Sequence, residues 1–297
     1  MARHAKTQRV IEEARAILAA FHPMTVRQVY YQLVSRQVIE NNRGAYQGVS
    51  DALVAARREC TIPWRWIEDR LRVPRGLGDG FTSVEGYLDF MIDRIVSGYS
   101  AATWPTQPRY VEAWLEKDAL SGIFADALRP YNVGLNVGRG YDGWSSIHNA
   151  AERFREAPQV ASCILYFGDF DPSGEDMVRS LAERLGDQGA APEIVKVALT
   201  VEDIERYHLP PNFTKPTDSR AAAHVARFGD LSVELDALPP NMLRDRIIEA
   251  VEQSLDMDAL GEVRAHEAEN RAWLVEQVEA IKRSQQDAAD DEWGGDS

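Results

Sequence analysis

The spacing of apolar residues near the start of the chain is helical. Over residues 6–21 apolar side chains recur every three or four positions, which predicts an amphipathic helix that ends before His22-Pro23. Thr25 and Gln28 have the spacing of a capping box, so we expect a second helix that runs to about residue 36. The same periodicity predicts a third helix over residues 46–59.

A short aromatic and basic stretch follows this third helix. Residues 62–67 contain a proline and are too few for a helix, so we expect an extended segment there. Three short helices followed by an extended segment are the order of a winged-helix domain, whose third helix usually enters the DNA major groove. Three-helix cores also serve as protein-interaction modules, so this pattern alone leaves both uses open. We place this domain at residues 1–76.

The second half of the chain alternates strand-like and helix-like segments. Residues 77–108 have glycines at the start, a helix-like stretch near 84–96 and a proline-rich end, and we expect them to be a connector. Beyond them we expect strands at 110–115, 133–137, 163–167 and 193–199, with helices between them and two more helices at 241–255 and 260–283. This alternation predicts a Rossmann-like α/β domain with a parallel sheet over residues 109–284, whose ligands lie at the carboxyl ends of the strands. The acidic tail at 285–297 has the composition of a disordered segment.

Charge is divided unevenly along the chain. The net charge is −14, yet residues 1–76 hold 13 Lys and Arg against 7 Asp and Glu, which leaves −20 for the remainder. A basic front segment favours contact with double-stranded DNA, although chance drift of surface charge is the alternative. The arginines that we expect to contact DNA are Arg43, Arg57, Arg58 and Arg65. The acidic remainder suits another task, such as holding metal ions.

The composition also narrows the setting and the metal chemistry. No apolar run reaches the roughly 20 residues that a membrane helix needs, and the first residues lack the apolar core of a signal peptide, so we expect a cytoplasmic protein. Cys60 and Cys163 are far apart and support neither a disulfide framework nor a thiolate metal site. The six histidines do not have the spacing of a zinc site, so any metal is expected to have oxygen ligands.

Carboxylates follow two of the expected strands. Asp169 and Asp171 come directly after the third strand, and Glu116 follows the first. If these strands are neighbours, the three carboxylates converge at one edge of the sheet, where hard oxygen ligands suit Mg²⁺. Crowded carboxylates raise one another's pKa unless a cation neutralises them, so the cluster needs a metal or the nearby Lys117. The alternatives are that the aspartates bond loop amides and that Glu116 interacts with a helix dipole.

The second helix carries two adjacent tyrosines on different faces. Steps of about 100° per residue put Val26, Val29, Tyr30 and Leu33 in one stripe, so Tyr30 is expected to face the core. Tyr31 falls roughly 140° from Val26, on the flank that a winged helix leaves open to DNA. We therefore expect Tyr31 to present the available hydroxyl, although an exposed tyrosine is normally an ordinary surface residue.

Five segments together resemble the A subunit of topoisomerase VI and its meiotic double-strand-break relatives. In chain order they are Arg27-Gln28-Val29-Tyr30-Tyr31, Leu115-Glu116-Lys117-Asp118, Gly138-Arg139-Gly140-Tyr141, Asp169-Phe170-Asp171-Pro172-Ser173-Gly174 and Val233-Glu234-Leu235-Asp236. They are similar to that family's Tyr-Tyr signature, Toprim glutamate motif, glycine turn, Toprim aspartate motif and a late acidic segment. The order and the spacing of the motifs match from about residue 5 to about residue 255.

The resemblance implies a winged-helix domain, a Toprim domain and a particular reaction. Tyr31 would attack a DNA phosphodiester and form a 5′-phosphotyrosyl link, with Mg²⁺ held by Glu116, Asp169 and Asp171. Arg27, one helical turn before Tyr31, would stabilise the attacked phosphate or lower the pKa of the tyrosine. The family works as a homodimer in which each tyrosine reaches the carboxylates of the partner, so we expect a homodimer here.

The resemblance also concerns the supporting residues and the partners. Lys117 and Gly140 are expected to support the site from the glutamate motif and the glycine turn. Because the first helix begins almost at Met1, the chain looks like the compact bacterial, phage or plasmid forms of the A subunit, without the extension that binds an ATPase subunit. Whether an ATPase partner exists stays open. We expect the protein at the nucleoid.

Two other functions are compatible with the sequence. A Toprim nuclease would hydrolyse DNA with a metal-activated water and leave Tyr31 idle. A non-catalytic DNA-binding regulator would bind DNA without cleaving it, while its Rossmann-like half senses a metal or a small ligand. A covalent adduct between protein and DNA separates the transesterase from the nuclease, and cleavage of either kind excludes the regulator.

Overall fold

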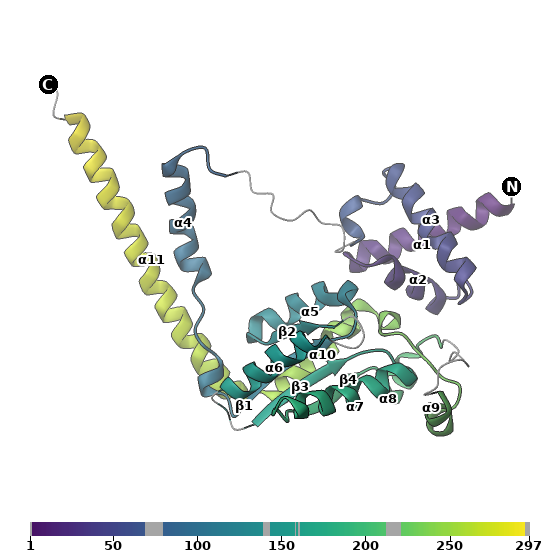
Figure 1. Cartoon of the computed structure of the whole chain (residues 1–297). Helices are drawn as coiled ribbons and strands as arrows, with labels where there is room; N and C mark the ends of the chain where they lie inside the picture. Colours follow the sequence, from purple (N-terminus) through teal and green to yellow (C-terminus); the bar gives the residue numbers. More distant parts are fainter. Residues whose placement is uncertain are drawn as a thin grey trace. The chain divides into compact units, whose positions relative to one another are not determined.

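The computed structural model describes residues 2–68, 80–138, 143–157, 159, 161–211 and 221–294 (Figure 1). The chain divides into two units, one formed by residues 1–73 with 108–255 and one formed by residues 74–107 with 256–297. The predicted boundary between residues 76 and 77 lies outside the described residues. None of the helices in the described ranges is long and apolar enough to cross a membrane.

Three helices and a short turn form the N-terminal part of the first unit. They are α1 (Ala2–Phe21), α2 (Val26–Ser35), α3 (Arg43–Arg58) and the 3₁₀ turn η1 (Trp64–Trp66). The capping box predicted at the start of α2 is present, with the Gln28 N–H donating to Thr25 Oγ1 at 3.1 Å. Asn42 caps α3, which therefore begins three residues earlier than the apolar periodicity predicts. Half of the segment predicted to be extended is η1, because Pro63 starts a turn, and its strand-like pairing is a single bridge between Ile67 and Met24.

Four parallel strands form the sheet of the first unit, in the order β2-β1-β3-β4. Their bounds are β1 (Arg109–Leu115), β2 (Gly134–Val137), β3 (Ala161–Phe167) and β4 (Glu193–Ala198). The predicted α/β class and the predicted parallel sheet are both confirmed. The last five residues of each central strand are buried because helices cover both faces of the sheet, and the one charged residue among them, Glu112, pairs with Arg153.

Successive residues of each strand point to opposite faces of the sheet, and each face packs against its own layer of helices. Trp114, Ile164 and Tyr166 pack with the helices α6 (Trp144–Glu156) and α7 (Pro172–Asp187). Phe167 on the opposite face contacts Phe124 of α5 (Ser121–Leu128) with ring centroids 4.8 Å apart, and α5 packs against α10 (Pro240–Ser254). The other elements are α8 (Val201–Tyr207), α9 (Ala221–Phe228) and the 3₁₀ turns η4 (Asp118–Leu120), η5 (Arg129–Tyr131) and η6 (Leu235–Ala237).

The second unit contains two long helices and a short turn, α4 (Val84–Gly98), η3 (Trp104–Thr106) and α11 (Met257–Gly294). The helix expected near 84–96 is present, but it packs on α11, so residues 74–107 form a structural unit with the C-terminal helix. The sequence had assigned this C-terminal helix to the domain 109–284. Helix α11 also continues to Gly294, across most of the segment 285–297 for which the sequence predicts no regular structure.

Candidate functional site

The strand order creates a switch point between β1 and β3. From β1 the chain moves outward to β2 on one side, and from β3 it moves outward to β4 on the other side. In open α/β sheets such a switch point leaves a crevice at the carboxyl ends of the central strands, where ligands bind. Leu115 and Phe167, the last residues of β1 and β3, are paired in register, so Glu116 and the loop that begins at Gly168 leave the sheet side by side.

Glu116 and Asp169, which the sequence expects at one edge of the sheet, are in direct contact there. The Asp169 N–H donates to Glu116 Oε2 at 3.0 Å. Gly168 makes this approach possible, because a Cβ at that position would lie 2.7 Å from Glu116 Oε2. Burial, together with the carboxylate of Asp169 and more weakly that of Asp171, raises the pKa of Glu116 to about 7. The site therefore holds a carboxyl group that titrates near neutral pH.

Lys117 is the counter-charge for the acidic residues around it. Its Nζ lies 2.9 Å from Asp169 Oδ1, 2.8 Å from Asp236 Oδ2 and 3.1 Å from Glu234 Oε2. Burial alone would lower the pKa of Lys117, but the carboxylates of Asp236, Asp169 and Glu234 outweigh burial and raise it. Lys117 is therefore a charged, largely buried amine. We call Glu116, Lys117, Asp169, Glu234 and Asp236 the carboxylate–lysine cluster.

Two members of the cluster, Glu234 and Asp236, come from a segment that was not expected to contribute to the site. Glu234 directly precedes η6 and Asp236 lies within it, and the Leu235 N–H between them donates to Asp169 Oδ1 at 2.7 Å. Asp236 is 1% exposed, and its Oδ1 has no hydrogen-bond partner among the described residues. Two acidic residues at alternate positions in an apolar run were the signal in the sequence, because a buried acid needs a cation.

Asp171 contacts the start of α7. It is the N-cap residue of that helix, and its Oδ1 accepts the Gly174 N–H at 2.7 Å. Gly174 is needed there, because a Cβ would lie 2.3 Å from the carbonyl oxygen of Asp169. Within the described ranges, no group of three acidic, histidine or cysteine side chains has the arrangement of a metal site. The three predicted magnesium ligands thus lie at one edge of the sheet. Glu116 and Asp169 contact each other, and Asp171 caps α7.

A second lysine lies beside the aspartate loop, and sequence reasoning missed it. Lys196 of β4 donates to the carbonyl oxygen of Asp169 at 3.3 Å and pairs with Glu175 of α7. Its Nζ also lies 5.4 Å from the centroid of the Phe170 ring. Gly140, which the sequence expects to support the site, lies outside the described residues.

Helix α2 meets the carboxylate–lysine cluster through Arg27. Arg27 Nη1 lies 2.5 Å from Glu234 Oε2, and the same oxygen contacts Lys117. Burial alone would raise the pKa of Glu234, but Lys117 and Arg27 lower it. This contact links the N-terminal helices to the ends of the central strands within one unit.

The expectation that Tyr31 lies on an open flank of α2 is wrong. Tyr31 is 3% exposed and Tyr30 is 4% exposed. Their rings contact each other edge to face with centroids 5.1 Å apart, and the Tyr30 hydroxyl donates to Asn41 Oδ1 at 2.7 Å. A helical wheel gives α2 one buried face, whereas α2 packs on α1 and α3 and also on η6. Contacts on two sides therefore cover both tyrosines.

The arginines expected to contact DNA lie on α3 and η1. Arg43, Arg58 and Arg65 are exposed. The Arg57 guanidinium lies 4.8 Å from the centroid of the exposed Trp64 ring, which is a cation–π contact. This surface offers positive charge together with an exposed aromatic ring.

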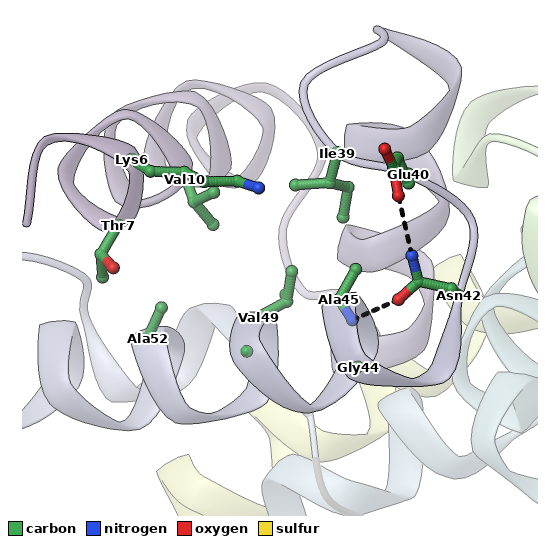
Figure 2. Close-up of a pocket in the computed structure, with 11 residues that line it drawn as sticks. Lys6, Thr7, Val10, Ile39, Glu40, Asn42, Gly44, Ala45, Val49 and Ala52 are labelled. Carbon is green, nitrogen blue, oxygen red and sulfur yellow. Dashed lines mark hydrogen bonds between the residues drawn. The ribbon is translucent and has the colours of Figure 1, made fainter. Parts of the chain in front are cut away.

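A pocket of about 310 Å³ lies between α1 and the first half of α3 (Figure 2). Small and apolar side chains make most of its wall, and Lys6 and Glu40 are the charged residues that line it. At one side Asn42 accepts a hydrogen bond from the Ala45 N–H at 2.8 Å and donates one to Glu40 Oε2 at 3.1 Å. The pocket shares no lining residue with the carboxylate–lysine cluster and none with the four arginines.

Comparison with known proteins does not assign the chain to a family. No model of a protein family matches the chain, and no curated protein matches it in sequence. A functional proposal therefore rests on the sequence motifs and on the geometry of the site.

Proposed function

We propose that this chain is a DNA-cleaving transesterase of the topoisomerase VI A-subunit type, built from a winged-helix domain and a Toprim domain. The observation that carries the proposal is the contact between Arg27 and Glu234, because it brings the tyrosine-bearing helix to the carboxylate–lysine cluster. This contact lies within one chain, whereas the resemblance implies a tyrosine that reaches the carboxylates of the partner. The cluster lies at the switch point of a parallel sheet, where α/β proteins bind ligands. The exposed arginines and the contact between Arg57 and Trp64 suit a DNA backbone.

In the proposed reaction the hydroxyl oxygen of Tyr31 attacks a phosphorus atom of DNA. A bond forms between Tyr31 Oη and phosphorus, the bond from phosphorus to the 3′ oxygen breaks, and that oxygen leaves with the tyrosine proton as a 3′-hydroxyl group. The reverse attack reseals the strand, so cleavage and resealing need no nucleotide. Arg27, one helical turn before Tyr31, would contact the attacked phosphate in place of Glu234.

The carboxylates at this edge of the sheet suit a magnesium ion. Mg²⁺ takes one or two protein carboxylates and completes its shell with water and phosphate oxygens. Glu116 and Asp171 each have a carboxylate oxygen that accepts no hydrogen bond from the described residues. We expect Glu116, Asp169 and Asp171 to hold the ion, which when bound neutralises charge on the scissile phosphate and on the leaving oxygen.

The burial of Tyr31 adds a requirement to the proposal. DNA reaches the buried Tyr31 hydroxyl only after the packing around α2 opens. We infer that α2 separates from η6, because the ion pair between Arg27 and Glu234 lies on that boundary. A phosphate that replaces Glu234 as the partner of Arg27 would favour this separation. Cutting both strands of a two-fold duplex also calls for a homodimer.

The same burial favours a second candidate function. In a Toprim-type nuclease, a metal ion held by Glu116 and Asp169 would activate a water molecule, and Tyr31 would remain a buried residue without a chemical role. This candidate needs no separation of α2 from η6. It predicts cleaved DNA that is never linked to protein.

A denaturing gel separates these functions. The full chain is incubated with end-labelled duplex DNA and Mg²⁺, and the reaction is stopped with detergent. The transesterase predicts label that migrates with the protein, disappears in Tyr31→Phe and persists in Tyr30→Phe. Free cut fragments in both variants would establish the nuclease, and uncut DNA that is nevertheless bound under native conditions would leave only the regulator.

A further inference from the structure

The unit formed by residues 74–107 and 256–297 has little core for helices of its length. Helices α4 and α11 run antiparallel, because Tyr99 at the end of α4 contacts Asn270 while Asp93 contacts Lys282 further along α11. Among the side chains of α4 that the structure describes, Ile92 is the one that is buried. Two helices that bury so little of their apolar surface are not a stable fold by themselves.

The apolar residues of α4 that stay exposed form a regular stripe. Val84, Leu88, Met91 and Ile95 are spaced by four, three and four residues, and they are 69%, 43%, 41% and 41% exposed. At about 100° per residue these four side chains lie within roughly 60° of one another, while Ile92 points to the side that contacts α11. This spacing is that of a coiled-coil seam, in which each apolar side chain packs against a second helix. We call these four residues the α4 seam.

The exposed apolar area around the α4 seam is similar to the area that one partner buries in a small protein–protein interface. Tyr87 flanks the seam, about 40° from Met91 around the helix, and is 46% exposed. The Phe81 ring contacts the Tyr87 ring with centroids 5.1 Å apart and is 50% exposed. Together with the seam they present roughly 550 Å² of apolar surface, close to the upper end of the largest patch on an ordinary monomer. Two such surfaces bury roughly 1,100 Å², which is above the roughly 1,000 Å² that a specific protein–protein interface should exceed.

The charges of this unit decide which partner fits. The described charged side chains of α4 are Asp89, Asp93 and Arg94, so α4 lacks the basic face with which amphipathic helices bind anionic lipid, and DNA would be repelled likewise. The partner is therefore another apolar protein surface. A second copy offers an identical seam, and a two-fold axis brings apolar positions onto apolar positions along its whole length.

We propose that two copies of this chain associate through their α4 seams, so that two α4–α11 hairpins form a four-helix bundle. The bundle supplies the core that one hairpin lacks, because each seam packs into the grooves of the other copy. This inference stands on the second unit alone. It does not depend on the proposed DNA chemistry.

Sedimentation velocity of the full chain at tens of micromolar tests the proposal. Leu88→Glu and Met91→Glu each place one charge on the seam, twice per dimer, and Ser97→Glu places the same charge on an exposed position of α4 away from the seam. Because all three positions are exposed, circular dichroism of the variants should match that of the wild type. We expect the wild type and Ser97→Glu to sediment as two chains of 33.3 kDa each, and either seam variant to weaken the dimer by about 100-fold.

Two results would overturn the proposal. A wild-type chain that stays monomeric at these concentrations has no self-association surface of this kind. Seam variants that dimerise as tightly as Ser97→Glu would place the dimer contact elsewhere on the chain. A monomeric wild type would also remove the homodimer that cutting both strands calls for, whereas seam variants that still dimerise leave the proposed function untouched. The covalent link between Tyr31 and DNA is measured separately by the denaturing gel, so failure of the seam and failure of the DNA chemistry are distinguishable.

Discussion

Replacing Glu116 by glutamine should change how the stability of the protein depends on pH. Burial and the neighbouring carboxylates raise the pKa of Glu116 from 4.5 to about 7 in the folded chain. A carboxyl group whose pKa rises on folding contributes stability that is complete below its unfolded pKa and is lost as the pH rises through its folded pKa. Glutamine never ionises, so only the wild type loses this contribution.

The size of the effect follows from these two pKa values. Proton linkage gives a loss of about 2 kcal/mol in the unfolding free energy of the wild type, relative to Glu116→Gln, between about pH 5.5 and about pH 8.5. Urea unfolding followed by tryptophan fluorescence in EDTA measures this difference at each pH. The glutamine side-chain oxygen still accepts the hydrogen bond from the Asp169 N–H, so the contact at the strand ends is kept.

The reasoning would be refuted if the wild type and Glu116→Gln differed in unfolding free energy by the same amount at about pH 5.5 and at about pH 8.5. Glu116 would then have the same pKa in the folded and the unfolded chain. Millimolar MgCl₂ gives a second comparison. If Glu116 is a ligand of Mg²⁺, the ion stabilises the ionised carboxylate, and the wild type should regain stability at about pH 8.5 more than the variant does.

Two further substitutions test the construction of the site. Lys117→Met leaves the buried carboxylates of Asp169 and Asp236 without their cation, so urea unfolding should give a loss of about 3 kcal/mol, and a loss below about 1 kcal/mol would contradict the role of Lys117 as their counter-charge. Gly174→Ala puts a Cβ against the carbonyl oxygen of Asp169 and should lower the melting temperature, with a cost of about 1–3 kcal/mol. Gly186→Ala in the same helix meets no atom within 4 Å and should stabilise the protein by up to about 1 kcal/mol, so equal effects of the two alanines would contradict the close approach at position 174.

Local patterns predicted the elements of the fold well. Each strand begins and ends within two residues of its expected position, because apolar runs bounded by turn residues leave little freedom in placing a buried strand. The pairing of α4 with α11 was not predictable, because about 160 residues separate the two helices. The apolar spacing of α4 also does not specify which helix packs against it. The sequence therefore gives the helix near residues 84–96 but not its partner.

The residues of the candidate site were likewise predictable only in part. Glu116 and Asp169 were predictable as neighbours, because both follow apolar strands and parallel strands end at one edge of a sheet. Glu234 and Asp236 were not, since their contacts with Lys117 cross more than 100 residues. The exposure of Tyr31 was predicted wrongly because the helical wheel contains no information on a second packing partner such as η6.

The most direct test of the proposed function is the chemical identity of a link between protein and DNA. The wild-type chain is incubated with duplex DNA labelled at either the 5′ or the 3′ end in the presence of Mg²⁺, denatured and digested with trypsin. Cleavage after Arg27 and Arg36 gives one peptide, residues 28–36, that contains both tyrosines, and fragmentation of this peptide in the mass spectrometer distinguishes them. The account predicts that 3′-labelled fragments stay with the protein, that 5′-labelled fragments are released, and that the nucleotide is attached to Tyr31. Attachment to Tyr30, a link to the 3′ end of the break, or cut DNA without any linked peptide would contradict it.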